Sequence, residues 1–261
     1  MSAPPQATPG DDEDPAIVEV GPEAASADLE RLLSAAERAA LARFTAPKRR
    51  ADWLLGRAAA KEAVARALAA AGAACPDPTA IEVAADADGA PRVALPPGLP
   101  RAVASLTHGH GRAAAWATLP DLGQGHPGVD LERVRPRPEG TLRFYLRPEE
   151  RARVLALAPG PGGDAWGPRD EAAVVVWALK EAAFKALAPA RGHGLLDVEV
   201  ALEGLLGAAP GASAWGAARG RARVVYVDRM AVRARALGVA AVDAGWRRAG
   251  NLVLAWARAR P

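Results

Sequence analysis

The chain has a single cysteine, Cys75, so it can form neither an internal disulfide nor a cysteine-rich zinc site. No uninterrupted apolar run reaches the ~18–20 residues needed to cross a bilayer. No dense run of lysine and arginine is present either, and 33 basic residues stand against 30 acidic ones for a net charge of +3. We therefore expect no membrane partner and no nucleic-acid surface.

The N-terminus lacks the basic and apolar regions of a signal peptide, since residues 1–15 are acidic and rich in proline and glycine. We expect a disordered leader over residues 1–15 and a cytoplasmic protein. Aromatic residues are scarce at 5%, yet half of the residues are hydrophobic. A sizeable core is therefore available, and the abundant alanine favours closely packed helices.

Helical and strand-like segments are interspersed, which predicts a mixed α+β fold. We expect helices over residues 26–44, 48–71, 148–157 and 170–187. Strands are expected over residues 17–20, 81–84, 91–95, 102–106, 113–119, 128–132, 197–202, 222–227 and 252–257.

The sequence also repeats itself weakly. Residues 60–68 resemble residues 179–187, and each segment precedes a similar strand, at separations of 119 and 117 residues. Two alanine-rich helices that share common residues would also explain this. The alternative is two similar α/β halves, residues 16–127 and 128–261, related by a pseudo-twofold axis with a ligand site between them.

Residues 128–132 (GVDLE) place two carboxylates at alternate positions of a strand. Asp130 and Glu132 would project from the same face, with Leu131 buried behind them. Gly128 would allow another backbone to approach closely. Such carboxylates repel each other unless a cation lies between them, and Mg²⁺ prefers oxygen ligands. A solvated acidic edge, paired with Arg133, Arg135 or Arg137, is the simpler alternative.

Residues 177–185 (WALKEAAFK) place Trp177, Glu181 and Lys185 on one face of a helix. Alone, Glu181 and Lys185 would be an ordinary exposed helix pair worth ~0.3–0.5 kcal/mol. Combined with the acidic strand, they supply a third carboxylate and a cation. This set suits a magnesium ion that binds a phosphate ester.

The two segments resemble the G-[IV]-D-x-E and W-x-x-K-E-[AS]-x-x-K signature of 4′-phosphopantetheinyl transferases of the surfactin-synthetase-activating type. Further segments in the same order extend the resemblance over most of the chain: residues 44–57, residues 105–108 (SLTH) and residues 192–195 (GHGL). None of these pieces is specific alone, but the ordered set is.

The resemblance implies transfer of the phosphopantetheine arm of coenzyme A to a serine of a carrier protein, which releases 3′,5′-ADP. Asp130, Glu132 and Glu181 would hold Mg²⁺, and Lys180 and Lys185 would contact the phosphates. The group that deprotonates the serine stays open between Glu181, a metal-bound water and Glu149.

His108 resembles the residue that contacts the 3′-phosphate of coenzyme A, and Thr107 replaces the usual second serine of that segment. Lys48 and Arg57 are further candidates for phosphate contacts. Ala90 stands where the family often has a lysine or arginine, and the stretch before Gly192 is longer than usual and contains Pro189.

The resemblance further implies a monomeric enzyme whose partner is an acyl or peptidyl carrier protein of a fatty acid, polyketide or nonribosomal peptide synthase. Two alternatives remain: a non-catalytic module that binds coenzyme A or a carrier protein, and another magnesium-dependent phosphotransferase. The absence of a G-x-x-x-x-G-K-[ST] loop argues against ordinary ATP use.

Overall fold

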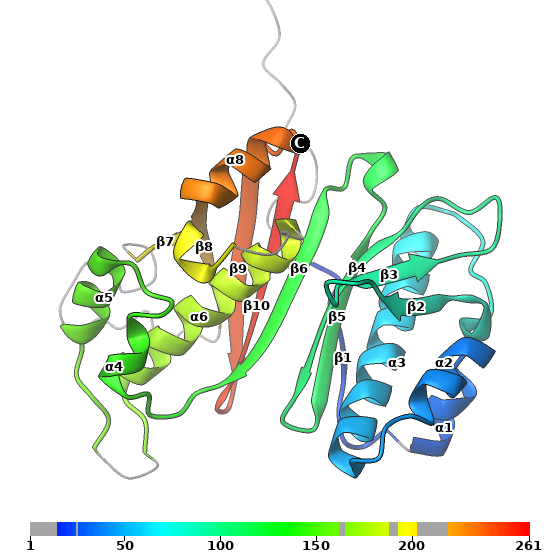
Figure 1. Ribbon diagram of the computed structural model, residues 1–261, viewed down its shortest axis with the longest axis horizontal. Helices are drawn as coiled ribbons and strands as arrows, with labels where there is room; N and C mark the ends of the chain where they lie inside the picture. The colour runs from blue at the N-terminus through cyan, green and yellow to red at the C-terminus, as the bar shows by residue number, and fades with distance from the viewer. Residues whose placement is uncertain (1–14, 25, 162–164, 188–192, 203–218) are drawn as a thin grey trace, which may run out of the picture.

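The computed structural model describes residues 15–24, 26–161, 165–187, 193–202 and 219–261. Two antiparallel sheets lie edge to edge in the middle of the molecule, and a long helix packs on each (Figure 1). The predicted mixed α+β class is confirmed. Within the described residues, no helix is long and apolar enough to cross a membrane.

The N-terminal part runs from β1 to η2. It contains β1 (Val18–Val20), α1 (Ser26–Arg31), α2 (Ala35–Leu41), α3 (Pro47–Ala70), η1 (Pro78–Ala80), β2 (Glu82–Ala85), β3 (Pro91–Ala94), β4 (Val103–Gly109), β5 (Arg112–Thr118) and η2 (Pro120–Leu122). Three strands form a sheet in the order β1-β5-β4, and β2 and β3 form a separate hairpin. Helix α3 packs on β4 and β5, and together they enclose one hydrophobic core.

The C-terminal part runs from β6 to β10. It contains β6 (His126–Arg133), α4 (Glu139–Leu142), α5 (Pro148–Leu155), α6 (Pro168–Leu187), η3 (Leu195–Asp197), β7 (Val198–Ala201), β8 (Arg219–Tyr226), α8 (Asp228–Ala236), β9 (Ala241–Ala249) and β10 (Leu252–Arg260). Its five strands pair in the order β6-β10-β9-β8-β7. Helix α6 packs on β6 and β10 over a second core.

The two parts share an order of elements: a first strand, short helices, a long helix and then two hairpins. In each, the first strand pairs antiparallel with the last one, β1 with β5 and β6 with β10. This common order agrees with the predicted repeat. The pseudo-twofold axis itself stays a prediction.

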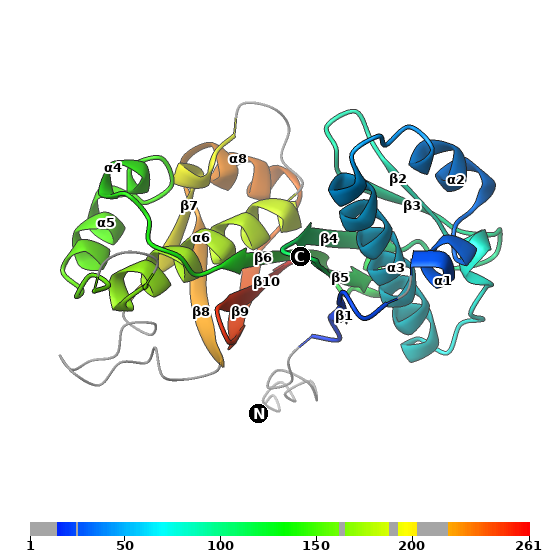
Figure 2. The ribbon, with the colours of Figure 1, turned by 90° about the horizontal axis from the view of Figure 1, so that it is seen from below.

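The two parts meet where β4 and β5 lie beside β6 and β10 (Figure 2). The Trp116 and Trp256 rings pack edge to face with their centroids 6.3 Å apart. The Val129 amide donates to Ser105 Oγ at 3.0 Å. This junction, which we call the seam, holds the candidate active site.

The predicted helix over residues 26–44 is wrong in one respect, because the structure has two helices there, α1 and α2. Ser34 begins the second one: its Oγ accepts from the Glu37 amide at 3.1 Å, and the Glu37 carboxylate accepts from the Ser34 amide at 2.8 Å. This is the Ser-x-x-Glu capping box, whose signal is present in the sequence. Helices α3, α5 and α6 lie within a few residues of their predicted positions.

Sequence reasoning missed helix α8 and strand β9. Strand β8 begins earlier than predicted and β10 ends later. The predicted leader, except for Pro15, lies outside the described residues, as do Pro189 and Gly192.

Candidate active site

Strand β6 presents both predicted carboxylates to helix α6. Lys185 Nζ donates to Asp130 Oδ1 at 2.7 Å, and Trp177 Nε1 donates to Glu132 Oε1 at 3.0 Å. Leu131, between them, points the other way into a small cluster with Ala114 and Leu254. The predicted common face of the two carboxylates is therefore confirmed, and so is the burial of Leu131.

Gly128 explains why the helix lies so close to the strand. A Cβ at this position would lie 1.9 Å from the carbonyl oxygen of Ala182, inside α6. Only glycine permits this approach, as the sequence predicted. The close packing brings the Glu181 and Lys185 turn of α6 onto the part of β6 that carries Asp130.

Glu181 is the third carboxylate of the cluster. Burial raises the pKa of Glu181, Lys185 opposes this rise, and the negative charges of Asp130 and Glu132 add to it. Burial also raises the pKa of Glu132, and Asp130 adds to that rise. The three carboxylates are therefore close enough to repel one another, and a cation among them would relieve the repulsion.

One buried oxygen of the cluster has no partner. Asp130 is only 5% exposed, and its Oδ2 forms no hydrogen bond. Three carboxylates, one of which has an unsatisfied buried oxygen, fit the chemistry of Mg²⁺. Within the described residues, however, no group of three or more His, Cys, Asp or Glu side chains is placed so that it could hold a metal ion. The Lys185 ammonium instead provides the positive charge beside Asp130.

Arg137 covers the outer carboxylate. Its guanidinium lies 3.2 Å from Glu132 Oε2 and stacks over the Trp177 ring at 5.2 Å. Tyr145 packs edge to face on the same ring, with the centroids 4.8 Å apart. Of the three arginines that we considered as partners for this strand, only Arg137 forms an ion pair with it among the described residues.

Lys180 corrects an expectation. We expected a phosphate contact, but its side chain is fully buried and its Nζ lies 2.6 Å from Glu150 Oε2. Burial lowers the pKa of Lys180, and Glu150 opposes this. An ammonium that is enclosed in this way cannot reach a phosphate at the surface, so Lys180 has another role.

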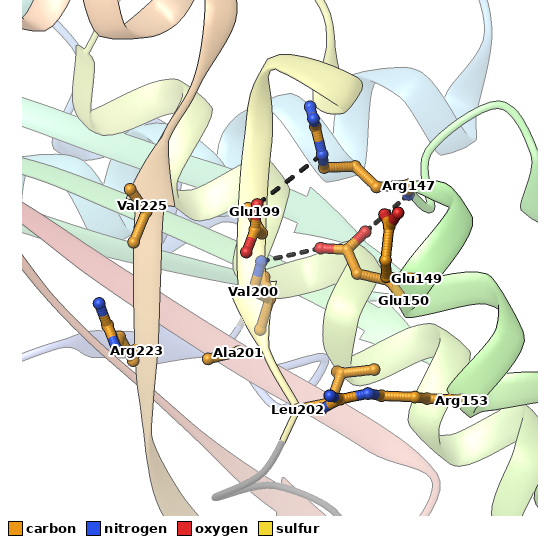
Figure 3. Close-up of a pocket in the computed structure, with 10 residues that line it drawn as sticks. All are labelled: Arg147, Glu149, Glu150, Arg153, Glu199, Val200, Ala201, Leu202, Arg223 and Val225. Carbon is orange, nitrogen blue, oxygen red and sulfur yellow. Dashed lines mark hydrogen bonds and ion pairs between the residues drawn. The ribbon is translucent and has the colours of Figure 1, made fainter.

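Glu149 also lies apart from the carboxylate cluster. It lines a cavity of about 590 Å³ between α5, β7 and β8, together with Arg147, Glu199 and Arg223 (Figure 3). None of the three clustered carboxylates lines this cavity. The structure therefore does not support Glu149 as the group that deprotonates the serine.

A second cavity, of about 400 Å³, lies beside the seam in the N-terminal part. Phe44, Trp53, Arg57 and His108 line it, together with Arg49 from the first turn of α3. It therefore combines aromatic rings with positive charge, a lining that suits an anionic ligand with a flat ring system.

Two predicted side chains shape this cavity. Arg57 is buried, lies 4.6 Å over the Trp53 ring, and has a buried Nε without a partner. Burial lowers the pKa of His108; Asp52 opposes this, whereas Arg57 and Lys185 add to it. Because the charge of Lys185 acts on the pKa of His108, the cavity lies near the carboxylate cluster.

Lys48 and Thr107 complete the predicted set. Lys48 is largely exposed, pairs with Asp52 at 2.6 Å, and does not line the cavity. Thr107 Oγ1 lies 3.4 Å from Asp130 Oδ1, so the N-terminal part reaches the carboxylate cluster across the seam. Gly89 and Pro91 line the cavity on either side of Ala90, where a longer basic side chain is the family expectation.

Comparison with known protein families and structures supports part of this site. Residues 127–207 match the family model of the 4′-phosphopantetheinyl transferase superfamily. The matched segment contains α6 and all of β6 except His126, and so every carboxylate of the cluster. The match supports a relationship to the superfamily but does not separate its types. No curated protein sequence matches the chain.

Several solved holo-[acyl-carrier-protein] synthases are similar to part of the chain. The Thermotoga maritima protein is 19% identical, with 52% of this chain and 62% of that one covered and a TM-score of 0.35. The Helicobacter pylori protein, solved with coenzyme A, is 15% identical, with 51% and 98% covered and a TM-score of 0.34. The Plasmodium yoelii protein is 17% identical, with 51% and 92% covered and a TM-score of 0.36. These likenesses are too slight to carry an argument.

Proposed function

We propose that this protein is a 4′-phosphopantetheinyl transferase of the surfactin-synthetase-activating type, or holo-[acyl-carrier-protein] synthase. It moves the phosphopantetheine arm of coenzyme A to a serine hydroxyl of an apo acyl or peptidyl carrier protein. One observation carries the proposal: Lys185 and Trp177 of α6 bind Asp130 and Glu132 on one face of β6, and Thr107 joins Asp130 to the strand that carries His108.

In the proposed reaction, the serine oxygen attacks the phosphorus that carries the pantetheine arm. The bond from that phosphorus to the bridging oxygen of the pyrophosphate breaks, and 3′,5′-ADP leaves with the bond's electron pair. Such chemistry depends mainly on positioning and charge stabilisation. Asp130, Glu132 and Glu181 would hold Mg²⁺, which would supply charge neutralisation at the pyrophosphate.

The chain's own residues supply the remaining parts. Lys185, the cation beside Asp130, is the phosphate-contacting lysine in this proposal. The acceptor of the serine proton stays open between Glu181 and a metal-bound water. Arg57 and His108 bind the 3′-phosphate end of coenzyme A in the aromatic cavity, and exposed Lys48 is a further candidate for a phosphate contact.

The proposal extends to the whole chain. Residues 16–127 and 128–261 form two halves of a monomer, and the substrate lies between them. The carrier belongs to a fatty acid, polyketide or nonribosomal peptide synthase. Exposed Arg133 and Arg135 lie at and just after the end of β6, and their charge favours an acidic partner surface there.

The test is intact-mass spectrometry of an apo polyketide-type carrier protein incubated with this protein, coenzyme A and Mg²⁺, with parallel samples in EDTA. We expect a mass gain of one phosphopantetheine that is lost in EDTA. Asp130→Ala should abolish the gain while circular dichroism shows a folded protein. No gain on polyketide, fatty acid or peptidyl carriers would refute the transferase, and coenzyme A binding without transfer would favour a binding module.

A further inference from the structure

The buried Glu150–Lys180 pair, which we call the C-terminal pair, joins four elements. Glu150 on α5 accepts the Arg147 amide on one oxygen and the Val200 amide of β7 on the other, each at 2.8 Å (Figure 3). Lys180 on α6 lies 2.6 Å from the first of these oxygens and also donates to the carbonyl of Leu195 in η3 at 3.4 Å. Every bond is directional, so the pair fixes how α6 is turned against its neighbours.

The N-terminal part contains the same device in Glu37 and Lys61, which we call the N-terminal pair. Glu37 accepts the Ser34 amide at 2.8 Å on one oxygen and the Val83 amide of β2 at 3.0 Å on the other. Lys61 on α3 lies 2.7 Å from Glu37 and donates to the Pro78 carbonyl at 2.8 Å. Both side chains are at most 3% exposed, as buried as those of the C-terminal pair.

Each pair lies beside a residue that faces a functional site. Glu181 follows Lys180 directly, and a helix turns ~100° per residue, so fixing the Lys180 side fixes the direction of Glu181. Arg57 lies one helical turn before Lys61 and therefore shares its face. The charge of Glu37 also raises the pKa of Arg57 against the effect of burial.

Buried ion pairs cost desolvation and are weak evidence for stability, but they can fix the register of packed elements. Alanine makes up much of the buried faces of α3 and α6, and its small side chain restricts the rotation of a helix less than a larger one does. We propose that the two pairs are positioning devices for the proposed function: the C-terminal pair aims Glu181 at the metal site, and the N-terminal pair aims Arg57 at the site for the 3′-phosphate of coenzyme A.

The test compares Lys180→Met with Lys61→Met, which remove the same buried charge from corresponding places. Two affinities are measured below the thermal transition of each variant. Mn²⁺ binding is followed by electron paramagnetic resonance, and 3′,5′-ADP binding by calorimetry in EDTA. We expect Lys180→Met to bind Mn²⁺ about tenfold more weakly, the scale of a lost supporting contact, with 3′,5′-ADP binding unchanged. Lys61→Met should show the reverse.

A merely structural role would shift both affinities equally in both variants or leave both unchanged, and either result overturns the proposal. If a single variant does not fold, a double variant that also neutralises the glutamate replaces it. Glu150→Gln/Lys180→Met then stands for Lys180→Met, and Glu37→Gln/Lys61→Met for Lys61→Met, because neither double variant leaves a buried unpaired charge. Unfolding of these double variants would also overturn it. A parent protein that binds no Mn²⁺ and transfers no phosphopantetheine would instead refute the proposed function.

Discussion

Gly128→Ala tests the close approach of β6 and α6 on which the site depends. The new Cβ would lie 1.9 Å from the Ala182 oxygen and 2.7 Å from the Ala186 amide nitrogen, where ordinary contact begins at 3.4 Å. The helix would have to move by about 1.5 Å. The Lys185–Asp130 contact, now 2.7 Å, would then open to about 4 Å, beyond hydrogen-bond range.

We expect this overpacking to lower the free energy of unfolding by ~1–3 kcal/mol. For a chain of this size, each 1 kcal/mol moves Tm by roughly 2–4 °C, which differential scanning calorimetry resolves. Phosphopantetheine transfer should fall about 100-fold, because displacement of a catalytic group by ~1 Å has an effect of that order. Carrier-protein mass spectrometry over time measures the rate.

Gly140→Ala is the matched control. Gly140 lies in α4, its φ is not in the left-handed region, and a Cβ there would meet nothing within 4 Å. Alanine should leave Tm unchanged or raise it slightly, since it favours helix. If Gly128→Ala kept the parent's Tm and rate, the reasoning about this contact would be wrong.

Three further outcomes are expected. Glu181→Gln should raise the metal-free free energy of unfolding by roughly 0.5–2 kcal/mol in urea titrations, because burial, which raises the pKa of Glu181, makes its charge unfavourable and Asp130 and Glu132 add to this; a less stable variant would show that the attraction of Lys185 outweighs these effects. Lys185→Met should lower that free energy, since Asp130 loses its cation; unchanged stability would show that Asp130 needs no partner. Because the pKa of His108 lies below the ordinary value of 6.5, stability should be full above pH 6.5 and fall as the pH drops through it toward the folded-state pKa. His108→Gln should weaken this loss, and an unaltered pH profile would show that His108 does not cause it.

The sequence predicted the parts of the site that depend on local periodicity. Alternation in a strand placed Asp130 and Glu132 on one face, and helical spacing placed Trp177 and Lys185 opposite them. The glycine before the acidic pair predicted a close backbone approach, and the structure has one. These inferences need only the geometry of a single element.

The role of Lys180 could not be predicted in this way. Helix α6 is buried on nearly every side, so no polar stripe reveals which face meets β6 and which meets α5. Two adjacent residues of one motif therefore have different surroundings: Lys180 lies in the core, and Glu181 belongs to the candidate site. Glu149 and Glu150 posed the same problem, since the buried neighbour proved to be the partner of Lys180.

The repeat was predictable from residues 60–68 and 179–187, but the ion pairs that its two lysines form were not. Shared letters cannot show that Lys61 and Lys180 each pair with a buried glutamate more than twenty residues earlier in the chain. That fact depends on tertiary packing. Helix α8 and strand β9 were missed because no motif drew attention to them.

The chain passes from the N-terminal to the C-terminal part once, through the short connection after β5. Thr107 and Asp130 nevertheless meet across the seam, on either side of that crossing. A chain cut at the exposed Leu122 would thus separate two fragments, neither of which carries the whole site. Enzymatic turnover would then report fragment complementation, and fusing each fragment to one of two interacting proteins would turn this junction into a sensor of their association.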